Sequence, residues 1–321
     1  MSMFFVFSHN FFPIANTFCM RKYTLHTLSS LFLALFLFTS CQSVAPNRDP
    51  SFSSDGSFPL VENSTPNADL TPELTPDPEQ IPVPLPEPPP ATNGAFWDVS
   101  DVDVSAIDPN RKLISFTFDD APSRTIEPIL AVFAAFNEEN PDCPATATFF
   151  FNGKYFDSNT PHTLHAARAL GMELGNHSYS HFDLTTLSET QLKDEIDRTD
   201  ALLQKIDGKK HHLFRAPFGR INELVRSAVH TPILDWTIDT LDWTGATEED
   251  IYHKIWTQKF SGAIVLMHDG YEPTVDALKR LLPDLKAAGY QVASVSAMAK
   301  AHACPLRNGG VYIRARKNGV G

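Results

Sequence analysis

The second half of the chain alternates short apolar segments with longer amphipathic ones, and this alternation constrains the fold more than any other feature. The short segments have the length and composition of strands, and the segments between them carry apolar residues at helical spacing. Strands joined by helical connections of this length pair in parallel. The seven predicted strands are 113–118, 147–151, 172–175, 212–214, 233–238, 263–267 and 290–295. This pattern predicts an α/β fold, a seven-stranded distorted (β/α) barrel with one strand fewer than the standard eight.

Capping residues and glycines mark the helix boundaries in the same region. Ser188 and Gln191 form a capping-box pattern at the start of a long helix that Gly208 ends. Thr247 begins another helix, whose acidic first turn suits the positive end of the helix dipole. The other expected helices are 127–136, 163–170, 224–229 and a last one that Pro273 opens and Gly289 ends. These helices supply the connections that a parallel sheet requires.

Chemically active side chains follow five of the predicted strands. In parallel α/β folds, ligands bind beyond the carboxyl ends of the strands, so side chains at these ends converge on one cleft. The residues concerned are Asp119 and Asp120, His177 and His181, Arg215, Asp239 and Asp242, and His268. Each alone is equally compatible with a cap, an ion pair or a satisfied polar group, and Asp239 stays open between a structural and a catalytic role. Together they predict an enzyme.

The spacing of His177 and His181 allows both imidazoles to reach one ion. Two histidines and one carboxylate make an open site for a first-row metal, with positions left for water and substrate. Neighbouring side chains on an extended segment diverge, so one of Asp119 and Asp120 can bind the metal while the other acts as general base. The metalloprotease pattern His-Glu-x-x-His is absent from the sequence, which argues against that class. The other histidines lack partners at ligand spacing and receive no role: His162, His165, His211, His212, His230, His253 and His302.

Five short motifs in this order resemble the polysaccharide deacetylases of the NodB-homology group, carbohydrate esterase family four. They are Thr117-Phe-Asp-Asp120, His177-Ser-Tyr-Ser-His181, Arg215-Ala-Pro-Phe-Gly219, Asp239-Thr-Leu-Asp-Trp243 and Leu266-Met-His268. The resemblance covers about 112–299, nearly the whole predicted domain. It implies a seven-stranded barrel and one divalent metal, zinc, with cobalt as an alternative.

The resemblance also implies a role for each motif residue. Asp119 would be the general base, and Asp120, His177 and His181 would bind the metal. Arg215 would pair with the base. Asp242 would orient His268, the general acid. Trp243 and Leu266 would wall the acetyl pocket, and the backbone N–H of Phe218 would bind the oxyanion. Ala121, Ala216 and Phe218 depart from the residues usual in the family, so substrate contacts are expected to differ.

The implied reaction is hydrolysis of acetamide groups on a GlcNAc-containing glycan to a free amine and acetate. Peptidoglycan, chitin or a related polymer would be the partner, and the domain is expected to act as a monomer. Two alternatives stay open. The same site would serve a carbohydrate O-deacetylase of the acetylxylan esterase type, and the domain could be a catalytically silent glycan-binding module. The intact set of motif residues favours an enzyme.

The segment 1–41 has the features of an export signal. Met20, followed by Arg21 and Lys22, resembles the start of a basic n-region, which makes Met20 the expected true start. An apolar run, 31–38, leads to small residues before Cys41, as in a bacterial lipoprotein cleavage box. We therefore predict an exported protein held at the membrane by lipid on Cys41, facing the periplasm or the cell exterior. An ordinary secretory signal is the alternative.

The segment 42–95 is rich in proline, serine, threonine and acidic residues and has few large apolar groups. Such a composition predicts an extended linker rather than a folded domain. It carries much of the formal net charge of −12, so this charge says little about the partner of the catalytic domain. No basic patch suited to nucleic acid is present in the sequence. The segment 96–321 is the predicted deacetylase domain.

Two cysteines, Cys143 and Cys304, fall inside the predicted domain. In an exported protein, such a pair is compatible with a disulfide that ties the second strand to the C-terminal tail. Two unrelated buried thiols are the alternative.

Overall fold

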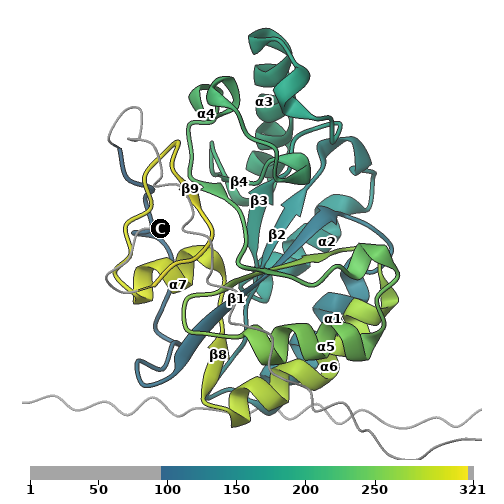
Figure 1. Cartoon of the computed structure of the whole chain (residues 1–321), viewed down its shortest axis with the longest axis vertical. Helices are drawn as coiled ribbons and strands as arrows, with labels where there is room; N and C mark the ends of the chain where they lie inside the picture. The colour runs from purple at the N-terminus through teal and green to yellow at the C-terminus, as the bar shows by residue number, and fades with distance from the viewer. Residues whose placement is uncertain (1–94, 317–321) are drawn as a thin grey trace, which may run out of the picture. The chain divides into compact units, whose positions relative to one another are not determined.

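The computed structural model describes residues 95–316 of the chain. The predicted export signal, the anchor at Cys41 and almost all of the predicted linker lie outside these residues. Within them, a curled parallel sheet has helices packed along its outer side (Figure 1). None of the described helices is both long enough and apolar enough to cross a membrane.

The sheet has nine strands in the described part of the chain, and every pairing between named strands is parallel. Their order is β6-β7-β1-β2-β3-β4-β5-β9, and β8 also pairs with β1. The strands are β1 (Lys112–Ala121), β2 (Thr148–Phe151), β3 (Glu173–Asn176), β4 (Leu213–Phe214), β5 (Ile233–Leu234), β6 (Ile238–Asp239), β7 (Ile264–His268), β8 (Tyr290–Val292) and β9 (Val311–Tyr312). The predicted α/β class with a curled parallel sheet is confirmed.

Strand β1 is the centre of the sheet. It is ten residues long, almost wholly buried, and pairs with β2, β7 and β8. Between Leu113 and Phe118 only the small polar residues Ser115 and Thr117 interrupt the apolar side chains, and both are buried, as expected of a strand covered on both faces. Its register with β7 places Asp119 directly opposite His268. The sheet therefore brings the first and last predicted catalytic residues together through backbone pairing alone.

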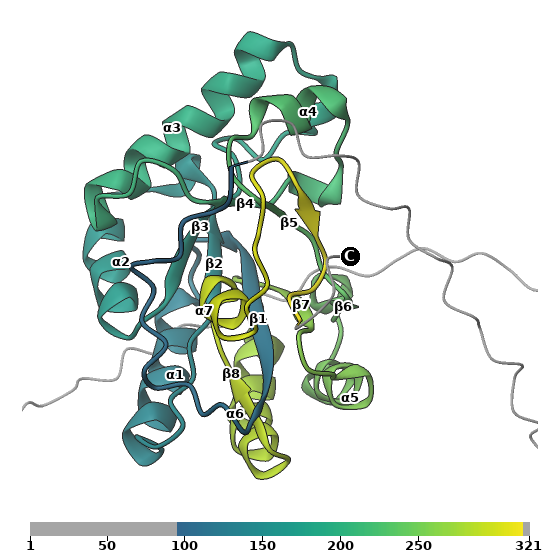
Figure 2. The ribbon, with the colours of Figure 1, turned by 90° about the vertical axis from the view of Figure 1, so that its left-hand side faces the viewer.

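Seven α-helices connect and cover the strands in the described residues: α1 (Ile126–Glu139), α2 (Thr160–Ala169), α3 (Glu189–Asp207), α4 (Glu223–Ala228), α5 (Glu248–Gln258), α6 (Glu272–Ala287) and α7 (Val295–Ala301). The expected capping box forms at Ser188 before α3, and a second one forms at Thr247 before α5. Helices α1, α6 and α5 lie next to one another along one side of the molecule, while α3 lies beyond β3 (Figure 2). This arrangement leaves the carboxyl ends of the strands free for the site.

Phenylalanine side chains fill the layer between the sheet and α1. The rings of Phe118 on β1 and Phe149 on β2 stack with centroids 4.8 Å apart, and Phe133 of α1 meets Phe118 edge-on. All three are fully buried. Burying such a side chain stabilises the fold by about 1.5–3 kcal/mol. This packing holds β1 rigidly, and with it the carboxylates at its end.

The predicted strand 233–238 is in fact two strands in different parts of the sheet. The N–H of Asp235 donates to Tyr312 on β9, whereas the N–H of Thr237 donates to Ile264 at the start of β7. The chain therefore leaves one side of the sheet after β5 and joins the other at β6. In the sequence, Asp235 and Thr237 alternate with apolar residues as in a single strand, and this pattern gives no sign of the change of partners, so the prediction of one strand was wrong.

The C-terminal region also differs from the expectation. The predicted strand 290–295 ends at Val292, and Ser294 caps α7 by accepting a hydrogen bond from the Ala297 N–H. Strand β9 was not predicted, because two residues are too few to show a period. Helix α7 packs against β1, and β9 pairs with β5 at the edge of the sheet.

Cys143 and Cys304 are both buried and free in the structure, so the predicted disulfide is not formed. Cys143 follows α1, where its N–H donates to Asn140. Cys304 follows α7 and packs in a separate apolar cluster that includes Tyr312. The two thiols occupy different environments, as the alternative of unrelated buried cysteines implies.

Candidate active site

Strained backbone is concentrated at the carboxyl ends of the strands. Among the described residues, six non-glycine residues have positive φ, and five of these lie at or just after β1, β3, β4 and β6. They are Asp120 (62°), Ser178 (66°), His181 (57°), Phe218 (60°) and Leu241 (58°). Residues in this region cost roughly 1–3 kcal/mol each and persist where the surrounding structure enforces them. All five belong to the predicted motifs.

Asp120, His177 and His181 form a group with the geometry of a metal site. One ligand atom from each lies within 4.8 Å of the others. The Asp120 Oδ1 atom is 3.8 Å from His177 Nε2 and 3.3 Å from His181 Nε2. The Nδ1 atom of His177 lies 2.9 Å from the Arg215 carbonyl oxygen. That nitrogen therefore carries the proton, and the Nε2 lone pair is left for a metal.

Three side chains outside the motif hold the loop that carries the two histidines. Asn152, at the end of β2, donates from Nδ2 to the His177 carbonyl at 2.6 Å. Glu195 of α3 accepts the Ser180 N–H at 2.6 Å, and Lys154 donates to the Ser180 carbonyl at 2.7 Å. The loop is thus fixed from two sides. Within the loop, the Ser178 hydroxyl also accepts the His181 N–H at 3.1 Å.

Asp119 is a buried carboxylate paired with a buried guanidinium. Arg215 Nη1 donates to Asp119 Oδ1 at 2.8 Å, and the remaining Arg215 donors reach the backbone of Leu234 and Asp235. Burial alone would raise the pKa of Asp119, but the charge and the hydrogen bond of Arg215 hold it below its ordinary value. Its second oxygen lies 3.6 Å from His177 Nε2. Asp119 is therefore ionised, oriented and next to the ligand group.

His268 is held by a carboxylate. Its Nδ1 lies 2.7 Å from Asp242 Oδ1, and its backbone N–H donates to Asp242 Oδ2 at 2.8 Å. Thr274 of α6 donates to the same Oδ2 atom. Burial alone would lower the pKa of His268, but the Asp242 hydrogen bond and the charge of Asp119 raise it above its ordinary value. The raised pKa favours the protonated ring, and strand pairing places His268 directly opposite Asp119.

The predicted pocket residues are a mixture of exposed and buried side chains. Phe218 and Trp243 are 59% and 53% exposed, whereas Leu266 is 3% exposed. The Phe218 ring meets the His181 ring edge-on, with centroids 4.7 Å apart. Asp239 accepts the Leu241 N–H and so supports the loop that carries Asp242. The structure places every predicted motif residue at this edge of the sheet.

Two aspartates near the site were not predicted. Asp269, next to His268, is buried and accepts from the hydroxyls of Ser123 and Thr125. Burial raises the pKa of Asp235 to about 6, opposed by Arg215 and increased by the charge of Asp119. Asp269 has a signal in the sequence, since it follows a strand-end histidine. Asp235 has none, because it lies inside an apparently continuous strand.

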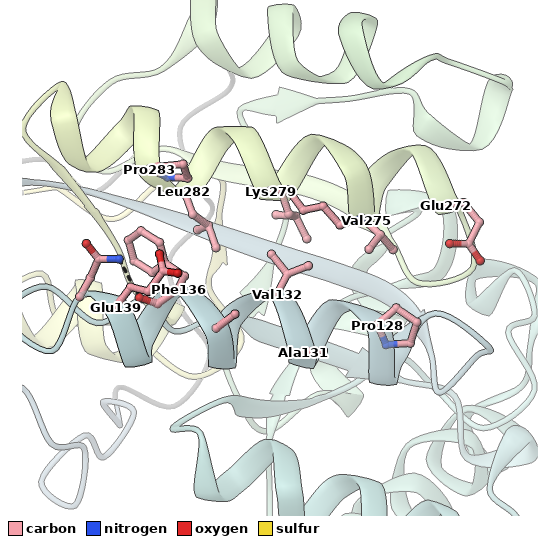
Figure 3. A pocket seen from close by; sticks show the side chains of 13 residues that line it. Pro128, Ala131, Val132, Phe136, Glu139, Glu272, Val275, Lys279, Leu282 and Pro283 are labelled. Carbon is pink, nitrogen blue, oxygen red and sulfur yellow. Dashed lines mark hydrogen bonds between the residues drawn. The ribbon is translucent and has the colours of Figure 1, made fainter.

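A groove of about 590 Å³ lies between α1 and α6, away from this group (Figure 3). Apolar side chains such as Val132 and Leu282 line it, and it includes none of the predicted site residues. The chemistry described above is confined to the carboxyl edge of the sheet.

The donor set suits a divalent cation. One carboxylate oxygen and two imidazole nitrogens are the usual ligands of zinc in open sites, and cobalt accepts the same set. Asp119 and His268, paired in register on β1 and β7, provide a carboxylate whose pKa is lowered and an imidazole whose pKa is raised. A site of this composition can activate water and protonate a leaving group, which is hydrolytic chemistry.

Comparisons with known proteins agree with this geometry. A family model described as polysaccharide deacetylase matches residues 106–231. The chain is 34% identical over 194 residues to peptidoglycan-N-acetylmuramic acid deacetylase PdaC of Bacillus subtilis, covering 59% of this chain and 39% of that protein. It is 33% identical over 204 residues to a peptidoglycan-N-acetylglucosamine deacetylase of Bacillus cereus, covering 58% of this chain and 88% of that protein.

Among solved structures, a family 4 acetyl xylan esterase from Clostridium thermocellum, in complex with a cobalt ion, superposes with a TM-score of 0.58. The two sequences are 25% identical, and the superposed region covers 63% of this chain and 98% of the esterase chain. The matched region therefore spans most of the Bacillus cereus protein and nearly all of the Clostridium thermocellum chain. It spans well under half of PdaC, which is a longer protein. This chain belongs to the polysaccharide deacetylase family of hydrolases.

Proposed function

We propose that this chain is a metal-dependent N-deacetylase that hydrolyses acetamide groups on a GlcNAc-containing glycan of the cell envelope. One observation carries the proposal. A buried, ionised Asp119 and a carboxylate-held His268 lie opposite each other in register on β1 and β7, beside a three-residue ligand group. A base, an acid and a Lewis-acid site in one cleft are the parts that amide hydrolysis requires.

Asp120, His177 and His181 would hold the cation. When bound, a divalent ion there would polarise the acetamide carbonyl and ease deprotonation of a water molecule. Asp119 accepts that proton, because it is ionised and its Oδ2 faces the ligand group. Arg215 keeps Asp119 in one orientation through the 2.8 Å contact. A base positioned in this way contributes about two to four orders of magnitude to the rate.

His268 completes the reaction by protonating the departing amine. Asp242 fixes its ring through Nδ1, which leaves Nε2 to deliver the proton. The backbone N–H of Phe218, in its left-handed conformation, would bind the developing oxyanion. Trp243 and Leu266 would enclose the acetyl group. Acetate leaves, and the sugar keeps a free amino group.

The substrate is proposed from the relatives. Two of the three proteins compared above are named for peptidoglycan deacetylation, and the third is an acetyl xylan esterase. The same site can hydrolyse an acetate ester, so O-deacetylation of xylan is the second candidate.

Acetate release from three substrates separates the candidates: peptidoglycan, an N-acetylglucosamine oligomer and acetylated xylan. We expect acetate and new amines from the first two. Release from xylan alone would assign O-deacetylation. Glycan binding without release from any substrate would make the domain a silent binding module.

We further propose that the protein is exported and anchored at the membrane through Cys41, with the segment 42–95 as a spacer. The support is the basic n-region, the apolar run and the small residues before Cys41. Cys41→Ser should leave an unprocessed precursor or release soluble protein. Normal processing with unchanged membrane retention would overturn the anchor.

A further inference from the structure

Two neighbouring loops carry the histidine ligands and the proposed oxyanion donor. The loop after β3 contains His177 and His181, and the 3₁₀ turn after β4 (Pro217–Gly219) contains Phe218. Strands β3 and β4 pair in parallel, so both loops leave the sheet at the same edge. His181 and Phe218 both have positive φ, a conformation that persists only where surrounding contacts enforce it.

An aromatic contact joins the two loops. The Phe218 ring meets the His181 ring edge-on, with centroids 4.7 Å apart. Phe218 is 59% exposed, and its ring carries no hydroxyl that could make a directional bond. This contact brings the loops together, but contact between rings alone allows one loop to slide against the other.

An ion pair joins the same loops two residues further along each of them. Asp183 follows His181 by two residues, and Arg220 follows Phe218 by two. Arg220 Nη1 donates to Asp183 Oδ2 at 2.6 Å, and the Arg220 guanidinium carbon lies 5.6 Å from the centroid of the Phe218 ring. A continuous series of contacts therefore runs from His181 through Phe218 and Arg220 to Asp183.

Each partner of the ion pair is fixed within its own loop. Asp183 Oδ1 accepts the N–H and the hydroxyl of Thr185 at 3.1 and 2.6 Å. The Arg220 N–H donates to the Pro217 carbonyl at 3.2 Å and so closes the turn that carries Phe218. Hydrogen bonds between charged partners are short and directional. Because both partners are held, their contact sets the distance between the two loops.

This distance matters for the reaction more than for the fold. The Phe218 N–H stabilises a developing oxyanion only if it is placed correctly relative to the ligand group, and small displacements of such donors reduce the rate strongly. The Arg220 and Asp183 side chains are 63% and 21% exposed. An ion pair this accessible to water adds little to the free energy of unfolding, so its loss should leave the domain folded.

We propose that Arg220 and Asp183 are a positioning pair for the reaction, which fixes the oxyanion donor Phe218 relative to the loop that carries the histidine ligands. This inference rests on the proposed function and extends it to two residues outside the five motifs. In this role the pair acts through Phe218 and His181 and does not contact the reacting atoms.

The kinetic test compares Arg220→Ala with native protein on an N-acetylglucosamine oligomer. We expect kcat to fall about tenfold, while KM and zinc affinity stay within about twofold of native. Arg220→Lys keeps a cation opposite Asp183 and should recover most of kcat. Arg280→Ala is the matched control, because Arg280 is 44% exposed and joins α5 to α6 through Glu248 and Glu249. That variant should have native kcat.

A double-mutant cycle tests the pairing itself. Asp183→Asn keeps an acceptor for Thr185 but removes the charge that Arg220 meets. Protein with both Arg220→Ala and Asp183→Asn should have the kcat of Arg220→Ala alone, since the two changes break one contact. Two independent losses that multiply in the double variant would overturn the pairing.

Hydrogen exchange at the Gly219 amide reports on the turn without any reaction. Its N–H donates to the Ala216 carbonyl at 3.0 Å, and it should exchange about tenfold faster in Arg220→Ala protein but at the native rate in Arg280→Ala protein. If native protein released no acetate from any substrate, the proposed function would fail, and faster Gly219 exchange would still support the positioning of the turn. Unchanged exchange, unchanged kcat, or a loss of zinc affinity as large as the loss of kcat would each overturn the positioning pair.

Discussion

The structure contains two groups of histidines and aspartates, and they differ in how the ring nitrogens are used. The rim cluster is Asp119, Asp120, His177 and His181 at the carboxyl edge of the sheet. The α3 clamp is Asp200, Asp207, His211 and His212, between α3 and the start of β4. Strand β4 separates them, since His212 precedes it and Arg215, the partner of Asp119, follows it.

In the α3 clamp, both ring nitrogens of His212 face carboxylates. Nδ1 lies 3.0 Å from Asp200 and Nε2 lies 3.2 Å from Asp207. Burial alone would lower the pKa of His212, but these two hydrogen bonds raise it, so the ring is a buried cation. In the rim cluster, a carbonyl occupies His177 Nδ1 and leaves Nε2 free. Proximity of histidine and aspartate is therefore not enough for a metal site. A histidine ligand also needs a ring nitrogen whose lone pair is not engaged by another group.

The clamp supports the cluster through one asparagine. Asn176 donates from Nδ2 to Asp200 and to the Ile196 carbonyl, and its Oδ1 accepts the Ser178 N–H. Asp200 thus holds the side chain that shapes the ligand loop. The two groups are connected by hydrogen bonds through Asn176, but they have different roles. We expect the α3 clamp to stabilise the fold and the rim cluster to bind the metal, and this separation of roles can be tested.

The largest effect is expected for Asp119→Asn. Turnover should fall by about two to four orders of magnitude, because the base is removed while its shape is kept. Zinc content, measured by elemental analysis, should stay near one per chain, since Asp120 and the histidines are intact. A near-native rate in this variant would show that Asp119 is not the base.

Loss of the clamp should reduce stability without affecting metal binding. His212→Gln leaves two buried carboxylates without their cation, which costs about 3–5 kcal/mol in the free energy of unfolding. Denaturant unfolding measures this loss, and zinc titration should give the native affinity. His253→Gln, a change at an exposed histidine, is the control. If His212→Gln abolished zinc binding while the fold stayed intact, the separation of tasks would be wrong.

The same residue predicts a pH dependence of stability. Its folded pKa is raised by Asp200 and Asp207 on α3, so its contribution is fully present below the unfolded value of about 6.5. The contribution is lost as pH rises through the folded pKa. The difference in free energy of unfolding between native and His212→Gln protein should therefore become smaller as the pH rises.

A smaller effect is expected from the support of the ligand loop. Glu195→Ala removes the acceptor of the Ser180 N–H, and zinc affinity should fall about 10- to 100-fold, as for other outer supports of metal ligands. Glu195→Gln keeps an acceptor oxygen and should restore most of the affinity. Equal loss in both variants would point to the charge of Glu195 rather than to its hydrogen bond.

The smallest effect concerns the alkaline limb of activity. His268 must be protonated, and Asp242, Asp119 and Asp120 raise its pKa, with the Tyr271 ring also facing it at 6.2 Å. Activity should be lost as pH rises through that raised value. Asp242→Asn should move the limb down by about one pH unit, whatever its effect on the maximal rate. If the alkaline limb of the pH–activity profile stayed in place in Asp242→Asn protein, a group other than His268 would determine its pH.

The rim cluster could be predicted from the sequence because its members lie at the end of the buried strand β1 or in the loop that follows β3. The strand patterns of β1, β3 and β7 are strong, and their ends carry Asp119, His177 and His268. The crossing of the chain between β5 and β6 could not be predicted, because Asp235 and Thr237 choose partners far along the chain.

Long-range polar contacts were also beyond prediction. No local pattern links His212 to Asp200, or Glu195 to Ser180, since each contact depends on how α3 packs beside the sheet. The predicted disulfide failed for the same reason: sequence position does not determine which buried thiols meet. Packing decides these contacts, and periodicity reports only which residues are buried.

The most direct test of the account is zinc add-back to chelator-stripped protein, with acetate release from an N-acetylglucosamine oligomer as the readout. Stripped protein should be inactive, and the rate should rise in proportion to added zinc until about one ion per chain is bound. His212→Gln protein should follow the same curve, whereas His177→Ala protein should stay inactive. Full activity in metal-free protein, or no acetate with one zinc bound, would contradict the account.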